Sequence, residues 1–432
     1  MAISYLDDLI AQGLVVVQET GDRTDSHMQS KSAARGHEAA GRAGEALAAA
    51  WVALDAAPDD QEAKARVTRL LDENPDLITA DRAPLLYRLL ADSNVDPSCI
   101  GAAGWTHLLR EAEILRAGAE ANPADIGHWL ETNTFAQRLL CETYVTSLDV
   151  EIALTALRRW LLLSGEWPRF PRTVEALAAQ AAQNGGAWFW DAEEEERLGI
   201  NGDATIAATY RPPPIVSSAR PVFADLITHA VASQYEGWPY PVWSRVMVSR
   251  TGTLPALIEE LDPDRPSQIS LRAKVLIAGC GTGREAAIWA RRYPDARITA
   301  IDISQASLRY GAERCEAARL SNIAFHMLDL HDVSSLNRTF DVIVCSGVLH
   351  HLPEPEKGWK ALVSVLEPGG AMRVMVYSKV GRLRVQAMQA LVADLAQRPV
   401  DDALLRAVRK RLIEKVPGSV ARSSDFFIMR HG

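Results

Sequence analysis

Three glycines at alternating positions, Gly279, Gly281 and Gly283, follow directly on an apolar run from Val275 to Ala278. The run has the length and composition of a buried parallel strand, and residues 285–292 are typical of a helix. Glycine adopts positive φ angles and lets a ligand lie against bare main chain. A strand, a glycine turn and a helix start therefore predict a ligand-binding crevice at the carboxyl end of a sheet.

The spacing of the glycines narrows the class of ligand. A dinucleotide-binding loop has the pattern G-x-G-x-x-G, but Arg284 stands where its third glycine would be. The pattern here is G-x-G-x-G, so a nicotinamide dinucleotide is disfavoured. A glycine loop alone is also compatible, though less so, with a tight turn that binds nothing. The interpretation therefore depends on the elements that follow it.

Acidic residues stand at the ends of the next two predicted strands. Residues 297–301 end at Asp302, about 20 residues after the glycines, where a carboxylate is placed to accept hydrogen bonds from ribose hydroxyls. Residues 323–328 end at Asp329, which is placed to accept a hydrogen bond from an adenine amino group. Each acid alone is more often a helix cap or a loop residue. Together, at successive strand ends of an α/β repeat, they indicate a single nucleoside site.

The segment from Lys274 to Tyr377 resembles the class I S-adenosylmethionine-dependent methyltransferases. The matching motifs keep that family's order and spacing: Ala278–Gly283, Ala300–Ser304, Leu328–Leu330, Phe340–Val344, Leu349–Leu352 and Leu366–Gly370. The resemblance implies an enzyme with an α/β, Rossmann-like sheet and S-adenosylmethionine as cofactor. The cofactor-binding residues that it implies are Gly279, Cys280, Gly281, Gly283, Asp302, Ile303, Asp329, Leu330 and Ser346. It places the glycines at the methionine part, Asp302 at the ribose, Asp329 at the adenine and Ser346 beside the sulfonium.

A second resemblance lies upstream, in Gln234–Trp243. This segment is similar to the Gln-Tyr-Glu-x-x-Pro-Tyr-Pro-x-Trp segment of bacterial proteins that join a helical, often tetratricopeptide-like region to such a domain. The prolines at 239 and 241 enforce an extended backbone, which projects the aromatic side chains as flat walls. One interpretation is a cap over the substrate pocket, in which Tyr235 and Trp243 contact the acceptor and Tyr240 is a candidate catalytic residue. The other is a linker whose aromatic side chains fill a domain interface.

The chemistry of a sulfonium limits what the protein must supply. The sulfonium is already a strong electrophile, so holding a nucleophile in line with the methyl group lowers much of the barrier. A general base is needed only for an acceptor that arrives protonated, and His350 is the candidate. His351 is a candidate substrate contact; in the alternative interpretation the two histidines only pack and line the pocket. No cluster of acidic or histidine residues has metal-ligand spacing, so no metal is expected.

Bulk properties limit the partners and the compartment. The net charge of −9 argues against unaided binding to nucleic acid. No run of 18 apolar residues predicts a membrane span, and the N-terminus lacks the features of a signal peptide. The five cysteines form no C-x-x-C pair, which favours a reducing compartment, the cytoplasm.

The 432 residues are long enough for two or three domains. The patterns predict four parts: a helical domain over 1–211, a linker and cap over 212–265, an S-adenosylmethionine-binding domain over 266–380 and a basic helical extension over 381–432. Within the helical domain, residues 142–163 are expected to form one helix. Arg158–Trp160 is a candidate partner surface, but a solvated face is the favoured interpretation.

The extension has too little room for the C-terminal hairpin that completes class I sheets. The fifth strand, residues 371–377, would then need another cover, because an apolar edge promotes pairing between molecules. The candidates are a helix from Asp401, the segment Phe426–Met429, the weaker Leu14–Gln18, or a second copy of the chain in a homodimer.

The sequence thus predicts a methyltransferase that acts on an N or O nucleophile of a peptide, a protein or a small molecule. The alternative is a catalytically silent S-adenosylmethionine-binding module whose helical region serves as an interaction scaffold.

Overall fold

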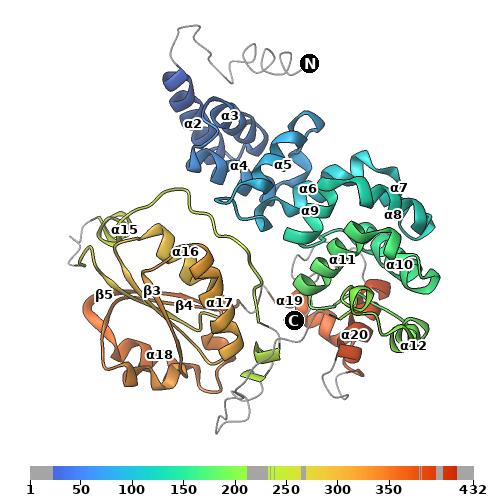
Figure 1. Cartoon of the computed structure of the whole chain (residues 1–432). Coiled ribbons are helices and arrows are strands. Elements are labelled where there is room, and N and C mark those ends of the chain that lie inside the picture. Colours follow the sequence, from blue (N-terminus) through green and yellow to red (C-terminus); the bar gives the residue numbers. More distant parts are fainter. Residues whose placement is uncertain are drawn as a thin grey trace. The chain divides into compact units, whose positions relative to one another are not determined.

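The structure, a computed structural model, describes residues 23–211, 232–233, 235–237, 239–263, 269–378, 380, 382–395 and 402–415. The chain divides into two compact units (Figure 1). One consists of Met1–Pro213 together with Ala390–Gly432, and the other of Pro214–Gln389. The second unit is therefore inserted between two parts of the first. The C-terminal segment, expected as a separate extension, belongs from Ala390 onward to the same unit as the N-terminal helices.

The first unit is helical, and successive helices pack against one another, as α2 does on α3 and α3 on α4. Several begin at side chains that accept a hydrogen bond from the first turn, such as Asp60 and Asn122. The α-helices among the described residues of this unit are α2 Arg23–Ala39, α3 Ala43–Ala56, α4 Gln61–Glu73, α5 Ala83–Ala91, α6 Ser98–Glu111, α7 Glu113–Arg116, α8 Pro123–Thr132, α9 Thr134–Glu142, α10 Leu148–Ser164, α11 Pro171–Asn184, α12 Ala192–Asn201, α13 Ala204–Ala207 and α20 Asp402–Lys415.

The expectation of a solvated face around Arg158 is wrong. Arg158 on α10 is buried, donates from Nη2 to the carbonyl oxygen of Phe189 at 2.6 Å, and lies 4.0 Å from the ring centroid of Tyr210. Arg159 pairs with Asp191, the first residue of a capping box that starts α12. The helix also begins at Leu148 rather than at residue 142. Its polar residues are used to hold neighbouring elements of the same unit.

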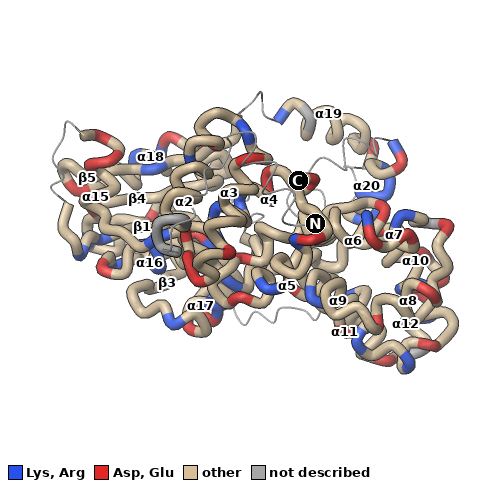
Figure 2. Tube along the Cα trace, turned by 90° about the horizontal axis from the view of Figure 1, so that it is seen from above, with Lys and Arg blue, Asp and Glu red and all other residues tan. Residues whose placement is uncertain are grey.

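The last helix, α20, closes the helical unit. Lys and Arg recur along it (Figure 2), but Arg409 is buried and forms an ion pair with Glu151 of α10. The two side chains are 2% and 5% exposed. This helix is one candidate cover for the fifth strand, and that candidate stays a prediction; its described ion pair lies within the helical unit. The segments Phe426–Met429 and Leu14–Gln18 lie outside the described residues.

The second unit contains a five-stranded sheet in the order β3-β2-β1-β4-β5, with every pair parallel. This confirms the α/β, Rossmann-like class. The strands are β1 Lys274–Ala278, β2 Arg297–Asp302, β3 Ile323–Met327, β4 Phe340–Ser346 and β5 Leu366–Met375. The fully described helices are α15 Leu254–Leu261, α16 Arg284–Arg292, α17 Gln305–Ala317, α18 Pro355–Ser364 and α19 Leu383–Leu391. The boundary between the two units falls within α19. β5 begins earlier than the predicted residue 371, with an irregular register against β4.

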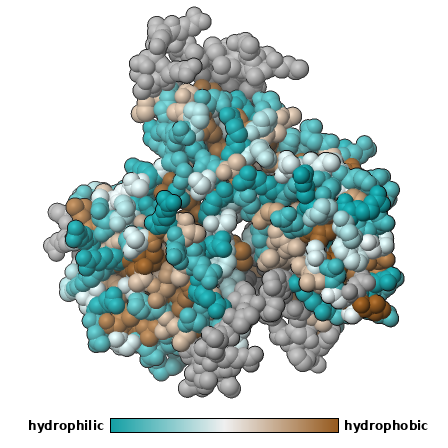
Figure 3. All heavy atoms as spheres, viewed as in Figure 1, coloured by the Kyte–Doolittle hydropathy of each residue, from teal (hydrophilic) through white to brown (hydrophobic). Residues whose placement is uncertain are grey.

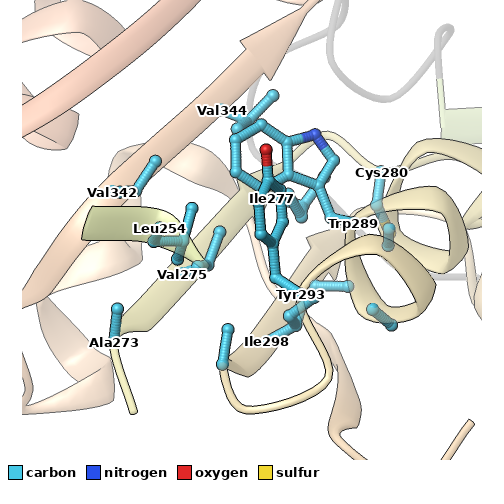
Figure 4. Close-up of a cluster of buried hydrophobic side chains, with 14 of the residues drawn as sticks. Leu254, Ala273, Val275, Ile277, Cys280, Trp289, Tyr293, Ile298, Val342 and Val344 are labelled. Carbon is cyan, nitrogen blue, oxygen red and sulfur yellow. The ribbon is translucent and has the colours of Figure 1, made fainter. Parts of the chain in front are cut away.

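Apolar side chains on both faces of the sheet form its core. On one face, side chains of α15, α16 and α17 pack on the strands, with Trp289 and Tyr293 against Val275 and Ile277 (Figure 4). On the other face, α18 and residues 330–336 cover the same strands. Because the central strands β1, β2 and β4 are buried on both faces, they appear in the sequence as largely continuous apolar runs.

β5 is an edge strand of this sheet. Among the described residues, no further strand pairs with its outer side, in agreement with the shortage of room for a hairpin. The surface of this unit carries hydrophobic patches (Figure 3). The exposed apolar side chains on α18 and at the end of β5 are Trp359, Val363, Met375, Val376 and Tyr377. Self-association at this edge stays a prediction.

Candidate functional site

The glycine loop connects β1 to α16 in a conformation that requires glycine. Gly279, Gly281 and Gly283 have φ angles of +67°, +53° and +75°. A Cβ atom on Gly281 would lie 2.8 Å from the carbonyl oxygen of Tyr240, and one on Gly279 would lie 2.3 Å from the Val348 side chain. The loop is therefore enclosed by the main chain before the sheet and by the segment after β4.

Asp302 ties this loop to the end of β2. Its Oδ2 accepts a hydrogen bond from the N–H of Gly281 at 2.7 Å, and its Oδ1 accepts one from the N–H of Ser304 at 2.9 Å. Burial raises the pKa of Asp302 above its usual value, against the opposing effect of these N–H groups. A carboxylate has about four acceptor positions, so two N–H bonds leave capacity for donors on a ligand.

Two further predicted residues follow β3 and β4. Asp329 accepts a hydrogen bond from the N–H of His331 at 2.8 Å, and the His331 ring nitrogen lies 2.9 Å from the same oxygen. Ser346 ends β4, and its buried Oγ has no partner among the described residues. Since the carboxyl ends of parallel strands share one edge of the sheet, Asp302, Asp329, Ser346 and the glycine loop lie along the same edge.

The aromatic segment before the sheet closes over the glycine loop. The Trp243 indole N–H donates to the carbonyl oxygen of Thr282 at 2.9 Å, and the Thr282 hydroxyl donates to the carbonyl oxygen of Pro241. The Tyr310 hydroxyl bonds to the main chain of Trp243. Trp243 is only 4% exposed, and Tyr240 is half-buried. The structure thus places Trp243 inside the unit, where it anchors the segment.

The same stretch of chain matches known proteins. Residues 275–370 match the family model described as methyltransferase domain. The sheet carries a class I S-adenosylmethionine-dependent methyltransferase domain. The trans-aconitate 2-methyltransferase of Deinococcus radiodurans is 32% identical over 119 residues, 28% of this chain and 42% of that protein. The malonyl-[acyl-carrier protein] O-methyltransferase of Acetivibrio thermocellus is 29% identical over 144 residues, 33% of this chain and 46% of that protein.

The similarity does not extend over whole proteins. An uncharacterised protein of Synechococcus is 36% identical over 186 residues, and the match spans 39% of this chain and 42% of that protein. The chain thus spans less than half the length of these three relatives. The solved structure of PKMT2 from Rickettsia typhi with AdoHcy is 23% identical, with a TM-score of 0.29 over 36% of this chain and 29% of that one. That likeness is too low to bear on function.

The histidine pair of the methyltransferase domain lies just after β4. The ring centroids of His350 and His351 are 4.2 Å apart, and the His350 ring also lies 4.1 Å from that of Tyr377. Both ring nitrogens of His350 are buried and have no partner among the described residues. Burial lowers the pKa of His350, as do the neighbouring His351 and Arg382. The lowered pKa favours the neutral form of the His350 ring, which has a nitrogen that can accept a proton.

Sequence reasoning gave no role to three residues of this edge: Thr282, Glu236 and Tyr377. Tyr377 follows β5, and its ring lies against that of His350 in a tilted arrangement; its place after a strand end could have identified it. Glu236 stands inside the aromatic segment Gln234–Trp243, to which the sequence assigned a role only through its aromatic side chains. Among the described residues, no group of three or more His, Cys, Asp or Glu side chains is arranged to hold a metal, and no helix is long and apolar enough to span a membrane.

Proposed function

We propose that the protein transfers the methyl group of S-adenosylmethionine to a nitrogen or oxygen nucleophile of a peptide, a protein or a small molecule. The observation that carries the proposal is the edge formed by the glycine loop, Asp302 and Ser346, within a methyltransferase domain. Two relatives named as O-methyltransferases, those acting on malonyl-[acyl-carrier protein] and in ubiquinone biosynthesis, favour an oxygen nucleophile.

The residues present fit this cofactor. The buried Ser346 Oγ lacks a partner and would stand beside the sulfonium, which presents a methyl group to attack. Asp302 would accept hydrogen bonds from the ribose, and Asp329 one from the adenine. The glycine loop would take the methionine part, since its main chain carries no side chains at the three glycine positions.

The acceptor would enter beside the histidine pair. We assign His350 the role of general base for an acceptor that arrives protonated, because its lowered pKa favours the neutral ring and its ring nitrogens have no protein partner among the described residues. Tyr240 is the second candidate catalytic residue, and Tyr235 and His351 are candidate acceptor contacts. Trp243 would act on the acceptor only through the segment that it anchors.

Isotope labelling tests the proposal. The full chain is incubated with lysate proteins and metabolites and methyl-labelled S-adenosylmethionine, and mass spectrometry follows the label. We expect one labelled acceptor class together with S-adenosylhomocysteine. An Asp302→Ala variant should lose the label, whereas Asp295→Ala, an exposed aspartate before β2, should keep it. Binding of the cofactor without label transfer to any acceptor would favour the scaffold function instead.

A further inference from the structure

Glu236 is a buried acid in the aromatic segment before the methyltransferase domain. Only 7% of its surface is exposed. The neighbouring Tyr235 lies close to Asp302: burial raises the pKa of Tyr235 to about 12, and the charge of Asp302 adds to that rise. This part of the segment therefore lies on the cofactor side of the sheet edge.

One oxygen of Glu236 is fully used. Its Oε2 accepts a hydrogen bond from the N–H of Ala306 at 3.1 Å and lies 3.0 Å from the Ser304 hydroxyl. Ser304 is also the residue whose N–H bonds to Asp302. Glu236 thus holds the turn that positions Asp302, at the start of α17, where the partial positive charge of the helix favours a carboxylate.

The other oxygen of Glu236 is buried and has no partner among the described residues. Leaving a charged acceptor without a donor is costly, and buried polar atoms in native proteins nearly always have a partner. Burial first, and the charge of Glu236 in addition, raise the pKa of Asp302, so the two acids lie close together at this turn. A ligand that brings hydroxyl donors to this turn would satisfy both carboxylates.

We propose that Glu236 is a second carboxylate of the cofactor site, and that its Oε1 accepts a hydrogen bond from a ribose hydroxyl of the nucleoside held at Asp302. The proposal rests on the proposed function. It makes Glu236 a specificity-determining residue supplied from outside the residues 275–370 that match the family model. The aromatic segment would then be part of the cofactor site as well as its cover.

A purely structural role for Glu236 makes a different prediction. If Glu236 only starts α17, its loss weakens every ligand of the site by the same factor. If it bonds to a ribose hydroxyl, its loss matters only for ligands that carry that hydroxyl. Glu236→Gln separates the two, because the amide oxygen can still accept from Ala306 while an NH2 group replaces the free acceptor.

Calorimetric titration of the full chain tests this with S-adenosylhomocysteine and its 2′-deoxy and 3′-deoxy analogues. We expect Glu236→Gln to weaken binding of the parent ligand about tenfold or more, as for a charged hydrogen bond. With one of the two deoxy analogues, wild type and variant should bind equally. The control is Glu313→Gln, which removes an exposed acid from α17, the helix whose start Glu236 contacts. This variant should bind all three ligands like wild type.

Equal weakening of all three ligands by Glu236→Gln, or no weakening of any, would overturn the inference and leave the proposed function intact. Failure of the wild type to bind S-adenosylhomocysteine would contradict the proposed function itself and the inference with it. Thermal unfolding of each variant confirms that the binding data come from folded protein.

Discussion

Replacing Gly281 with alanine should damage both the stability and the ligand affinity of the methyltransferase domain. Gly281 has a φ angle of +53°, and an alanine in this left-handed conformation destabilises the fold by about 1–2 kcal/mol. Its Cβ would also lie 2.8 Å from the carbonyl oxygen of Tyr240, which is main chain and cannot rotate away. Overpacking of this kind costs about 1–3 kcal/mol. The two costs together amount to about 2–5 kcal/mol.

Hydrogen exchange measured by mass spectrometry resolves this effect within the domain. Amides of β1 and of the segment around Tyr240 should lose protection in Gly281→Ala, and binding of S-adenosylmethionine should weaken or disappear. Gly199→Ala is the matched control, because Gly199 lies in α12 with ordinary φ and open space around its Cβ position. That change should be neutral or slightly stabilising. A Gly281→Ala protein with wild-type protection and affinity would refute the reasoning.

Three further perturbations follow from the described contacts. Glu151→Gln leaves the buried charge of Arg409 uncompensated and should lower the free energy of unfolding of the helical unit by about 3–5 kcal/mol in denaturant melts; a loss below about 1 kcal/mol would contradict a buried pair. Trp243→Phe removes the hydrogen bond to the Thr282 carbonyl and should lower the free energy of unfolding by about 1–3 kcal/mol, while the folded variant keeps its turnover. Lost turnover at full stability would instead indicate that Trp243 contacts the acceptor. For His350, whose pKa is lowered, kcat/KM should hold above pH 6.5 and fall only at lower pH, and His350→Asn should abolish that fall; an unchanged profile would exclude the base role.

The sheet could be predicted because its signals are local. Apolar runs, glycine turns and acids at strand ends each depend on a few consecutive residues, and β1, β2 and β3 start within one residue of the predicted positions. β5 is the exception, since it begins at Leu366 rather than at residue 371. The main chain that contains Pro368 and two glycines is part of this strand, although its register against β4 is irregular.

The remaining features depend on contacts between distant residues. Arg158 is buried because Trp188, Trp190 and Tyr210 surround it, which the periodicity of its own helix does not show. The pairing of Glu151 with Arg409 joins residues 258 positions apart, so the place of α20 in the helical unit could not be predicted from a basic tail.

The glycine loop shows a similar limit within the site. The sequence explained Gly281 by the approach of a ligand, whereas the structure adds the protein's own Tyr240 carbonyl as a direct steric reason. In the same way, the aromatic side chains of the segment Gln234–Trp243 left a cap and an interface linker open. The structure adds a contact of its acid, because the Ser304 hydroxyl donates to Glu236 Oε2. Which groups a loop encloses is decided by elements far away in the chain.

The central claim is that the edge around Asp302 binds S-adenosylmethionine, and calorimetric titration of the full chain measures this directly. We predict one cofactor per chain and at least about a tenfold loss of affinity in Asp302→Ala, from one or two charge-assisted hydrogen bonds. Asp295→Ala should bind like wild type. The account would be contradicted if the wild type gave no binding heat, or if a folded Asp302→Ala variant bound as tightly as wild type.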